Sequence, residues 1–304
     1  MNWLSYERQE WLRQQRGGLL LIGAAFVVAA TTAVLLSMRT STDDPIVDRK
    51  TQCLADENLT GHRVIIIDGT DKFDQTQQEI LQRVVRGEAR QMHQYEKLTI
   101  AALDQGDPYN PHIVFSACAP ESASEGNRWS ENPEILDSIW RNKFLAPALA
   151  PVPATVDHTA QKETPLIETI FGLTLRPDFR PAVGRRRLVI VSDMLQNTKL
   201  YSHYHGTPSF KDFTVRPEAL QNIPDLTGVS VVGYYIIRTR SMMLQSDAQK
   251  QFWIDYFKAA QTSVEFEGWP WPKLQALRQS VAEHAGAPAK RTPHRHRRHR
   301  SSAP

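Results

Sequence analysis

Short apolar runs, each rich in β-branched residues, recur along the chain at residues 63–68 (RVIIID), 188–193 (LVIVSD) and 229–237 (VSVVGYYII). Runs of this length and composition are typical of strands that are buried on both faces of a parallel sheet. Two further runs, at 98–103 and 112–117, flank a turn-rich segment and predict two short neighbouring strands. The hydrophobic pattern therefore predicts at least five strands.

The stretches between these runs have helical periodicity. Asp74 and Gln77 are spaced as a capping pair at the start of one such stretch. In segment 164–173, Thr164 takes the cap position and Pro165 the first turn, where both residue types are favourable. Other predicted helices cover residues 132–149, 246–257 and 273–284. Strands that alternate with helices indicate an α/β fold, with a doubly wound, mainly parallel sheet.

An uncharged run of 21 residues, positions 17–37, precedes these elements. At about 1.5 Å per residue, a helix of this length crosses the roughly 30 Å hydrocarbon core of a bilayer. We therefore predict a transmembrane helix at 17–38, after an arm at 1–16 whose aromatic residues suit a membrane interface. A cleaved signal peptide is the alternative, although its apolar region is normally only about 7–15 residues long.

The sequence gives a weaker signal for which end of this helix faces the cytoplasm. Basic residues mark the cytoplasmic side, but they flank the run in similar number on both sides. Cys53 and Cys118 lie on the same side of it, and they fit either a disulfide in an oxidising compartment or two buried thiols. We expect the arm in the cytoplasm and the main domain outside the cytoplasmic (inner) membrane, in the periplasm. The expected layout continues with a linker at 39–60, the α/β domain at 61–285 and a disordered basic tail at 286–304.

Two of the predicted strands end in aspartate, at Asp68 and Asp193. Parallel strands of an open α/β sheet finish at one edge, and ligands bind there, so we expect the two carboxylates to meet. Thr70 follows in the first loop, and Thr164 begins a helix that could bring a hydroxyl to the same edge. Carboxylate and hydroxyl oxygens are the ligands that hard divalent cations such as Mg²⁺ prefer.

This set resembles the metal-ion-dependent adhesion site of the von Willebrand factor A-type domain. That site combines a first-strand Asp-x-Ser-x-Ser motif, a distant loop threonine and a later aspartate after a buried strand. The residues that resemble these positions, in the same order, are Asp68, Thr70, Thr164 and Asp193. The resemblance covers about residues 62–265. It implies a von Willebrand A-like fold, a protein-binding role and Mg or Mn as the candidate cofactor.

One position departs from the motif: Lys72 stands where the second serine is expected. An ammonium group cannot be a metal ligand, and it would instead neutralise Asp68 and Asp193. The sequence therefore predicts a degenerate site that either still holds a divalent ion or works without metal. Asp71 and Lys72 are further candidate binding residues at this edge.

A metal-dependent hydrolase is the competing interpretation. His203 and His205 follow Asp193 on the next loop, and with Asp68 and Asp193 they could hold Zn²⁺ or Mn²⁺ and activate water. The alternative for these histidines is an exposed, aromatic-rich loop. The common nucleophile, phosphate-loop and dinucleotide motifs are missing, which argues against an enzyme.

The charge is unevenly distributed along the chain. The formal net charge is only +3, but six basic residues lie within the last fifteen positions. Such a tail can make nonspecific contacts with polyanions, or simply remain solvated. The sequence as a whole favours a membrane-anchored protein-interaction module of the bacterial envelope, with a single span and a protein partner that the sequence does not identify. An inert structural subunit is the third interpretation.

Overall fold

The computed structural model describes residues 21–35, 46–55, 59–126, 132–157 and 161–267. The chain divides into two compact units, Met1–Ile46 and Val47–Pro304. In the first unit, residues 21–35 are helical. Among the described residues, no helix combines the length and apolarity that a membrane crossing requires. The predicted span at 17–38 extends past the described part at both ends, and the predicted helix at 273–284 and the basic tail lie outside it.

The second unit is built on a six-stranded sheet with the order β3-β2-β1-β4-β5-β6. Neighbouring strands are parallel except β2 and β3, which are antiparallel. The strands are β1 (Gly61–Ile67), β2 (Lys97–Ala102), β3 (His112–Cys118), β4 (Arg185–Ser192), β5 (Val229–Tyr235) and β6 (Val264–Glu267). The first five confirm the predicted strands, whereas the short β6 was not predicted. This order fits the predicted von Willebrand A-like or Rossmann-like architecture.

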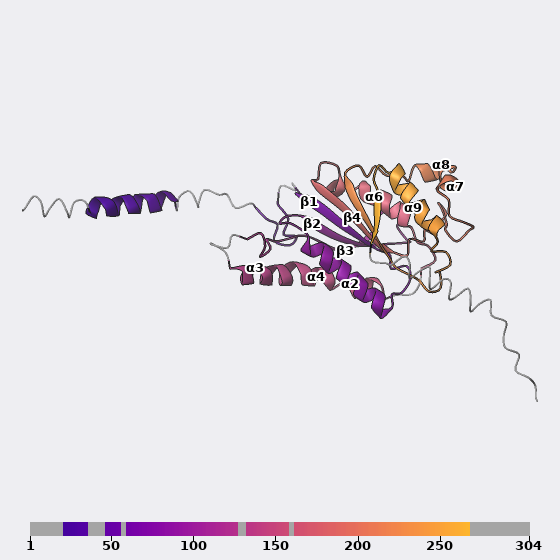
Figure 1. Cartoon of the computed structure of the whole chain (residues 1–304), viewed down its shortest axis with the longest axis horizontal. Coiled ribbons are helices and arrows are strands. Elements are labelled where there is room, and N and C mark those ends of the chain that lie inside the picture. The colour runs from indigo at the N-terminus through magenta and orange to yellow at the C-terminus, as the bar shows by residue number, and fades with distance from the viewer. Residues whose placement is uncertain (1–20, 36–45, 56–58, 127–131, 158–160, 268–304) are drawn as a thin grey trace, which may run out of the picture. The chain divides into compact units, whose positions relative to one another are not determined.

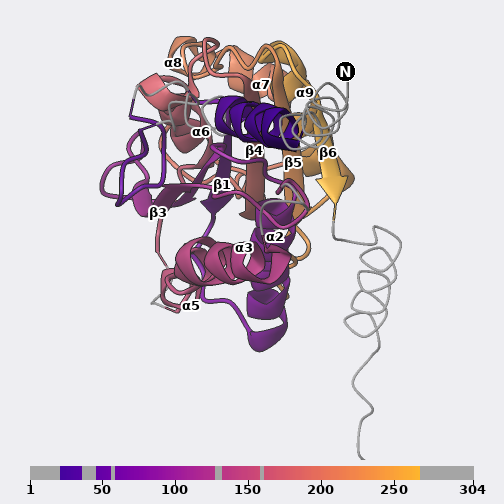
Figure 2. The same ribbon diagram turned by 90° about the vertical axis from the view of Figure 1, so that its left-hand side faces the viewer.

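Helices cover both faces of the sheet, as two perpendicular views show (Figures 1 and 2). One face carries α2 (Gln75–Arg90), α3 (Pro133–Trp140), a π-helical turn (Arg141–Leu145), α4 (Ala146–Leu149) and α5 (Val152–Thr155). The other carries α6 (Leu166–Thr174), α7 (Phe210–Thr214), α8 (Pro217–Leu220) and α9 (Asp247–Ala259), and a 3₁₀ turn (Pro177–Phe179) precedes β4.

Strand β1 shows why both layers are needed. Val64 and Ile66 pack into the layer that contains α6 and α9, while Ile65 and Ile67 pack against α2. All four side chains are fully buried. Burial of each side chain stabilises the fold by roughly 1.5–3 kcal/mol. A sheet covered on one face only would leave two of the four side chains in water. The continuous apolar run therefore encodes a central strand.

The sequence signals for helix starts are partly confirmed. Asp74 and Gln77 form a reciprocal capping box at α2, and Ser246 caps α9. The interpretation of Thr164 as a cap was wrong, because α6 begins at Leu166 and its cap position is Pro165. Thr164 instead pairs with Asn197 in an isolated antiparallel bridge, since the Thr164 N–H donates to the Asn197 carbonyl (2.9 Å) and the Asn197 N–H to the Thr164 carbonyl (3.0 Å).

Part of the segment that was expected to be a linker belongs with the sheet. Val47 and Leu54 form an antiparallel bridge, and the Cys118 N–H donates to the Thr51 carbonyl (2.7 Å). Cys53 and Cys118 are joined by a disulfide. Because Cys118 pairs with Lys97 at the start of β2, this attachment lies where the parallel strands begin. We call that side of the sheet the amino edge and the opposite side the carboxyl edge.

Candidate functional site

The carboxyl edge contains a topological switch point. From β1 the chain crosses to β2 on one side, and it later returns to place β4 on the other side. Asp68 and Asp193 follow β1 and β4 directly, and the Asp68 N–H donates to the Val191 carbonyl (3.0 Å). The two aspartates therefore end neighbouring strands at the place where open α/β sheets bind ligands.

Hydroxyl groups surround the Asp68 carboxylate. Thr70 donates to Oδ1 (2.6 Å), and Ser192 donates to Oδ2 (2.5 Å). Thr164 in turn donates to the Thr70 hydroxyl (3.1 Å), across 94 positions of sequence. Asp68, Thr70 and Thr164 are thus brought together in one buried hydrogen-bonded chain. Ser192 was not among the predicted residues, although it ends β4 immediately before Asp193.

Asp193 is buried beside this chain. Its Oδ1 accepts from the Leu195 N–H (2.9 Å), and its Oδ2 lies 3.8 Å from Arg238 Nε. Burial and the neighbouring charge of Asp68 raise the pKa of Asp193 to about 8, against the opposing effect of Arg238. Asp193 therefore retains much of its proton at neutral pH.

Arg238 is the functional residue that the sequence analysis missed. Its side chain is only 7% exposed, and its guanidinium stacks 4.4 Å from the centre of the Phe73 ring. It donates to the carbonyls of Lys72 (3.0 Å) and Asp71 (3.1 Å), so it ties β5 to the loop that follows β1. One signal could have found it: Arg238 follows the predicted strand 229–237 directly, at the same edge as the two aspartates.

Lys72 does not take the role that was expected of it. Its ammonium pairs with Asp157 (2.5 Å), and both side chains are largely exposed. A cation does lie beside the acidic pair, but Arg238 supplies it. Asp71 and Lys72 contribute their backbone carbonyls to the site, and the charge of Asp71 also raises the pKa of Asp193.

The backbone after Asp193 is held in an unusual conformation. Met194 has φ +60°, a region that non-glycine residues rarely adopt. Its carbonyl accepts from Trp253 Nε1 (2.7 Å) and Gln249 Nε2 (2.5 Å), both on α9. These donors fix the turn that carries Asp193, since a left-handed residue persists only where its surroundings stabilise it.

His203 does not join Asp68 and Asp193 in a metal cluster. It is fully buried among Tyr201, Phe252 and Trp253, which corrects the expectation of an exposed loop for this residue. Burial lowers its pKa to about 3, so the ring is neutral, and Nδ1 lies 3.2 Å from the Met194 carbonyl. His205 is exposed on the same loop. Among the described residues, no group of three or more His, Cys, Asp or Glu could hold a metal ion.

The donor set at the carboxyl edge does not fit a divalent ion well. Both oxygens of Asp68 already accept short hydrogen bonds from hydroxyl groups. The cation Arg238 lies beside Asp193, and a second positive charge there would be repelled. Within the described residues, the cation that lies next to Asp193 is the Arg238 guanidinium.

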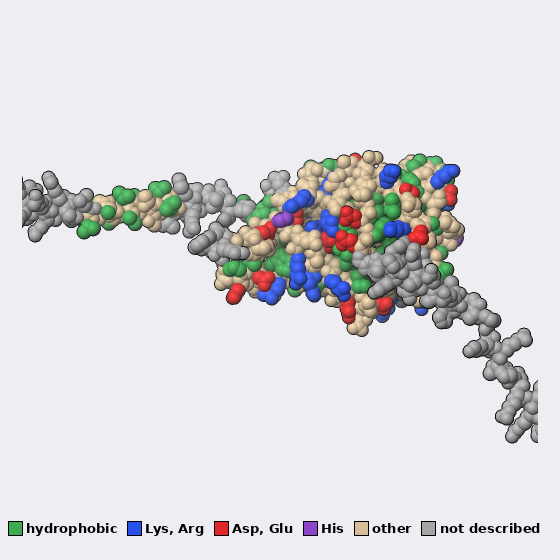
Figure 3. Space-filling model, viewed as in Figure 1, with side chains coloured by type: hydrophobic (Ala, Val, Ile, Leu, Met, Phe, Trp, Pro, Cys, Tyr) green, Lys and Arg blue, Asp and Glu red, His purple; other side chains and the backbone are tan. Residues whose placement is uncertain are grey.

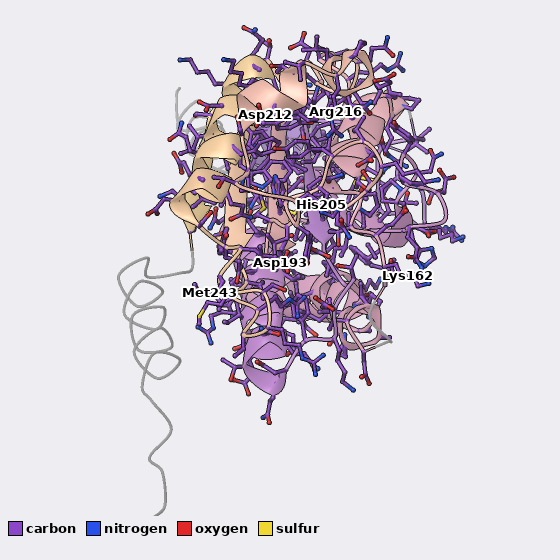
Figure 4. All side chains as sticks on the ribbon, turned by 90° about the vertical axis from the view of Figure 1, so that its right-hand side faces the viewer. Lys162, Asp193, His205, Asp212, Arg216 and Met243 are labelled. Carbon is purple, nitrogen blue, oxygen red and sulfur yellow. A yellow bond between two sulfur atoms is a disulfide. The ribbon has the colours of Figure 1, made fainter. Side chains whose placement is uncertain are left out.

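Exposed groups border this buried centre. Tyr204 and Met243 are 41% and 65% exposed. Burial, Asp193 and the other nearby acidic side chains raise the pKa of the Tyr204 hydroxyl, which indicates that the ring lies close to the acidic pair. Asp193, His205 and Met243 are labelled in Figure 4, which looks onto this side of the domain. The carboxyl edge thus has a polar buried centre and an aromatic and thioether rim.

No protein-family model and no curated protein matches the chain. Among solved structures, an aerotolerance-related membrane protein from Bacteroides fragilis has 11% identity and a TM-score of 0.33, covering 73% of this chain and 98% of that one. BatB from Bacteroides thetaiotaomicron has 12% identity and a TM-score of 0.32, covering 74% and 99%. Proximal thread matrix protein 1 from the mussel byssus, with a zinc-occupied adhesion-site motif, has 10% identity and a TM-score of 0.32, covering 75% and 48%. Similarity this low supports no inference, so the fold rests on the strand order and the site on its contacts.

The raised pKa of Asp193 predicts a pH-dependent stability. The folded chain holds this proton up to about pH 8, whereas an unfolded aspartate releases it near pH 4. The free energy of unfolding is therefore not reduced by Asp193 below about pH 4, where both states hold the proton. It falls as the pH rises from 4 to 8, because the unfolded chain releases the proton first. Asp193→Asn should match the parent near pH 4 and become steadily more stable than the parent as the pH rises, with a difference in the free energy of unfolding on the order of 5 kcal/mol at pH 8.

Denaturant titrations at several pH values measure this difference. Asp212→Asn, at an exposed position on α7, serves as the matched control and should show no such trend. A difference between Asp193→Asn and the parent that is independent of pH would contradict the assignment of the proton to Asp193.

Proposed function

We propose that the protein is a membrane-anchored protein-interaction module whose carboxyl edge docks a partner protein. The observation that carries the proposal is the convergence of Asp68, Asp193 and Arg238 from three adjacent strands, next to the exposed side chains of Tyr204 and Met243. Aromatic residues, Met and Arg are enriched at protein interfaces. A charged centre with such a rim is suited to recognition by another protein.

The chemistry of the edge favours binding over catalysis. A hydrolase of the kind considered above needs a histidine that reaches the two aspartates, whereas the His203 ring is enclosed by aromatic rings, and neither His203 nor His205 joins a described group of three or more residues that could hold a metal ion. Asp193 and Asp68 are engaged in fixing Arg238 and the neighbouring loops. We therefore propose that Arg238 keeps the edge in its binding conformation without Mg or Mn.

The anchor is the second part of the proposal. The uncharged run at 17–37 has the length of a single span, and the Cys53–Cys118 disulfide suits an oxidising compartment. Both features support an orientation with the arm inside and the domain outside the cytoplasmic membrane of a bacterial cell. A reporter that is active only in an oxidising compartment, fused after Pro304, should be active, and an inactive fusion would reverse this orientation.

Photo-crosslinking from the rim tests the interaction surface. A photoreactive amino acid placed at Tyr204 or Met243 of the full chain, in its native membrane, should capture one discrete partner. The same group at Ile135, an exposed apolar position on α3, is the matched control and should not. Equal capture from Ile135 would contradict a specific carboxyl-edge surface.

The same capture assay tests the proposed independence from metal. Capture through Tyr204 should be unchanged when Mg²⁺ or Mn²⁺ is added or chelated, and it should fall several-fold in Arg238→Gln. Capture that requires a divalent ion would show instead that the edge is a working metal-dependent adhesion site.

A further inference from the structure

The amino edge of the sheet gathers basic residues by strand register. Arg63 of β1 is level with Arg187 of β4, and Arg187 is level with Ser230 of β5, so the three side chains form one row across the sheet. Two residues nearer the amino edge along the same strand, Arg185 is level with Gly61. The basic run at 185–187 therefore lies next to another arginine on a parallel neighbour, at the edge opposite the acidic pair.

Two carboxylates form direct ion pairs with these arginines. Glu88 of α2, which is fully buried, is shared by two arginines: Arg187 donates to both of its oxygens (3.0 and 3.1 Å), and Arg63 forms a second ion pair with it. Glu96 pairs with Arg185 at 2.8 Å. In direct ion pairs these arginines have two carboxylate partners, Glu88 and Glu96, while Asp225 and Glu267 act on Arg186 and Arg187 from farther away.

Arg186 makes its hydrogen bonds to neutral groups, although the Asp225 carboxylate acts on its charge from farther away. Its guanidinium donates to the backbone carbonyls of Thr227 (2.6 Å) and Phe179 (3.3 Å), both neutral groups. Among the described ion pairs it has no carboxylate partner within 4.0 Å. Two carbonyl acceptors leave further N–H donors of this guanidinium free for a ligand.

A cavity of about 300 Å³ opens among these side chains. Its walls include Arg63, Arg185, Arg186 and Arg187, together with Glu96, His93 and Ser230. The positive surface continues along α2, where the exposed residues Arg83, Arg86 and Arg90 share one helical face that ends next to the cavity at Gln91. In the space-filling view, basic side chains gather over the region of α2 (Figure 3).

We propose that this cavity binds a phosphate group. The planar guanidinium donors of several arginines match the oxygens of a phosphate, and the Ser230 hydroxyl adds a neutral donor at the wall. The guanidinium groups around the cavity attract an anion, and the arginine stripe on α2 extends the attraction into solvent.

The chain path suggests one source of the phosphate, and this step rests on the membrane anchor of the proposed function. The disulfide attaches Cys53 to the amino edge, and only positions 39–52 separate it from the predicted span. Because residues 46–52 are held at the amino edge with Cys53, the connection at 39–45 reaches on the order of 25 Å when fully extended, at about 3.3–3.6 Å per residue. The cavity would then stay within reach of the membrane surface, where anionic lipid headgroups carry phosphate. A soluble phosphate compound is the other source of the same chemistry.

Calorimetric titration of the full chain in neutral detergent micelles tests the site. The probes are inorganic phosphate, soluble short-chain phosphatidylglycerol and short-chain phosphatidylcholine. We expect saturable binding of at least one of the first two probes. Arg186→Gln should weaken it about tenfold, and Arg185→Gln, at an exposed side chain whose replacement should leave folding intact, about three- to fivefold.

Two controls separate this site from other basic surfaces. Arg141→Gln removes an exposed arginine on the π-helical turn, and the triple variant Arg295→Gln/Arg297→Gln/Arg298→Gln removes the same chemistry from the tail. Both should bind as the parent does. Absence of binding to phosphate and phosphatidylglycerol, or binding that only the tail variant weakens, would overturn the proposal.

The probes also identify the source. Preference for phosphatidylglycerol over inorganic phosphate would assign the cavity to lipid headgroups, while the reverse would assign it to a soluble phosphate compound. Because the phosphate titration needs neither an inserted anchor nor a protein partner, its outcome is independent of the crosslinking result at the carboxyl edge.

Discussion

Replacing Arg238 with glutamine is expected to lower the free energy of unfolding by about 3–5 kcal/mol. The change removes the cation beside the buried pair Asp68 and Asp193, together with the donors to the loop carbonyls. The loss should be greater at pH 8 than at pH 5, because Asp193 is protonated at the lower pH and then needs less compensation. Denaturant unfolding at the two pH values measures both effects.

Two variants make this prediction specific. Arg240→Gln changes an exposed arginine two positions later and should leave stability nearly unchanged. At pH 8, Arg238→Gln should cost less stability in an Asp193→Asn background than in the parent, because the aspartate change removes the charge that the arginine change leaves unpaired. A double variant whose stability equals the sum of the two separate effects would show that Arg238 acts through packing alone.

Replacing both cysteines with serine is expected to lower the free energy of unfolding by about 2–4 kcal/mol. The Cys53–Cys118 disulfide closes a loop across 65 positions and therefore restricts the unfolded chain strongly. It also fixes residues 46–55 against the end of β3. The denaturation midpoint of the parent, measured with and without a reducing agent, should differ in the same direction.

The serine variant provides the control for that measurement. Its midpoint should be insensitive to the reducing agent, and it should agree with the midpoint of the reduced parent. Identical midpoints for the oxidised parent and the serine variant would contradict a stabilising role for the bond.

The central sheet could be predicted from the sequence because its strands are buried on both faces. Continuous apolar runs such as 63–68 and 188–193 are too short to span a membrane and too apolar for a strand with one face in water, and the aspartates that end them mark one edge. Strand β6 could not be predicted in the same way. It is an edge strand of four residues, VEFE, whose side chains are alternately half-buried and exposed, so its apolar content is low.

The details of the site were harder to predict because they depend on distances between side chains. A sequence shows that Lys72 and Arg238 both lie near the edge, but it does not show which cation reaches Asp193. Burial of His203 was hidden for a similar reason. Its loop mixes polar and aromatic residues and was expected to be exposed, yet Tyr201 and the aromatic face of α9 enclose the ring.

The attachment of Cys53 to β3 has a mechanical consequence. Tension applied to the chain on the amino-terminal side of Cys53 passes through the disulfide into Cys118, at the margin of the sheet. The central strand β1, whose end carries Asp68, is thereby shielded from the pull. If the bond were reduced, the same force would act on β1 directly. Tension on the chain before Cys53 would then be transmitted along β1 to Asp68 at the carboxyl edge.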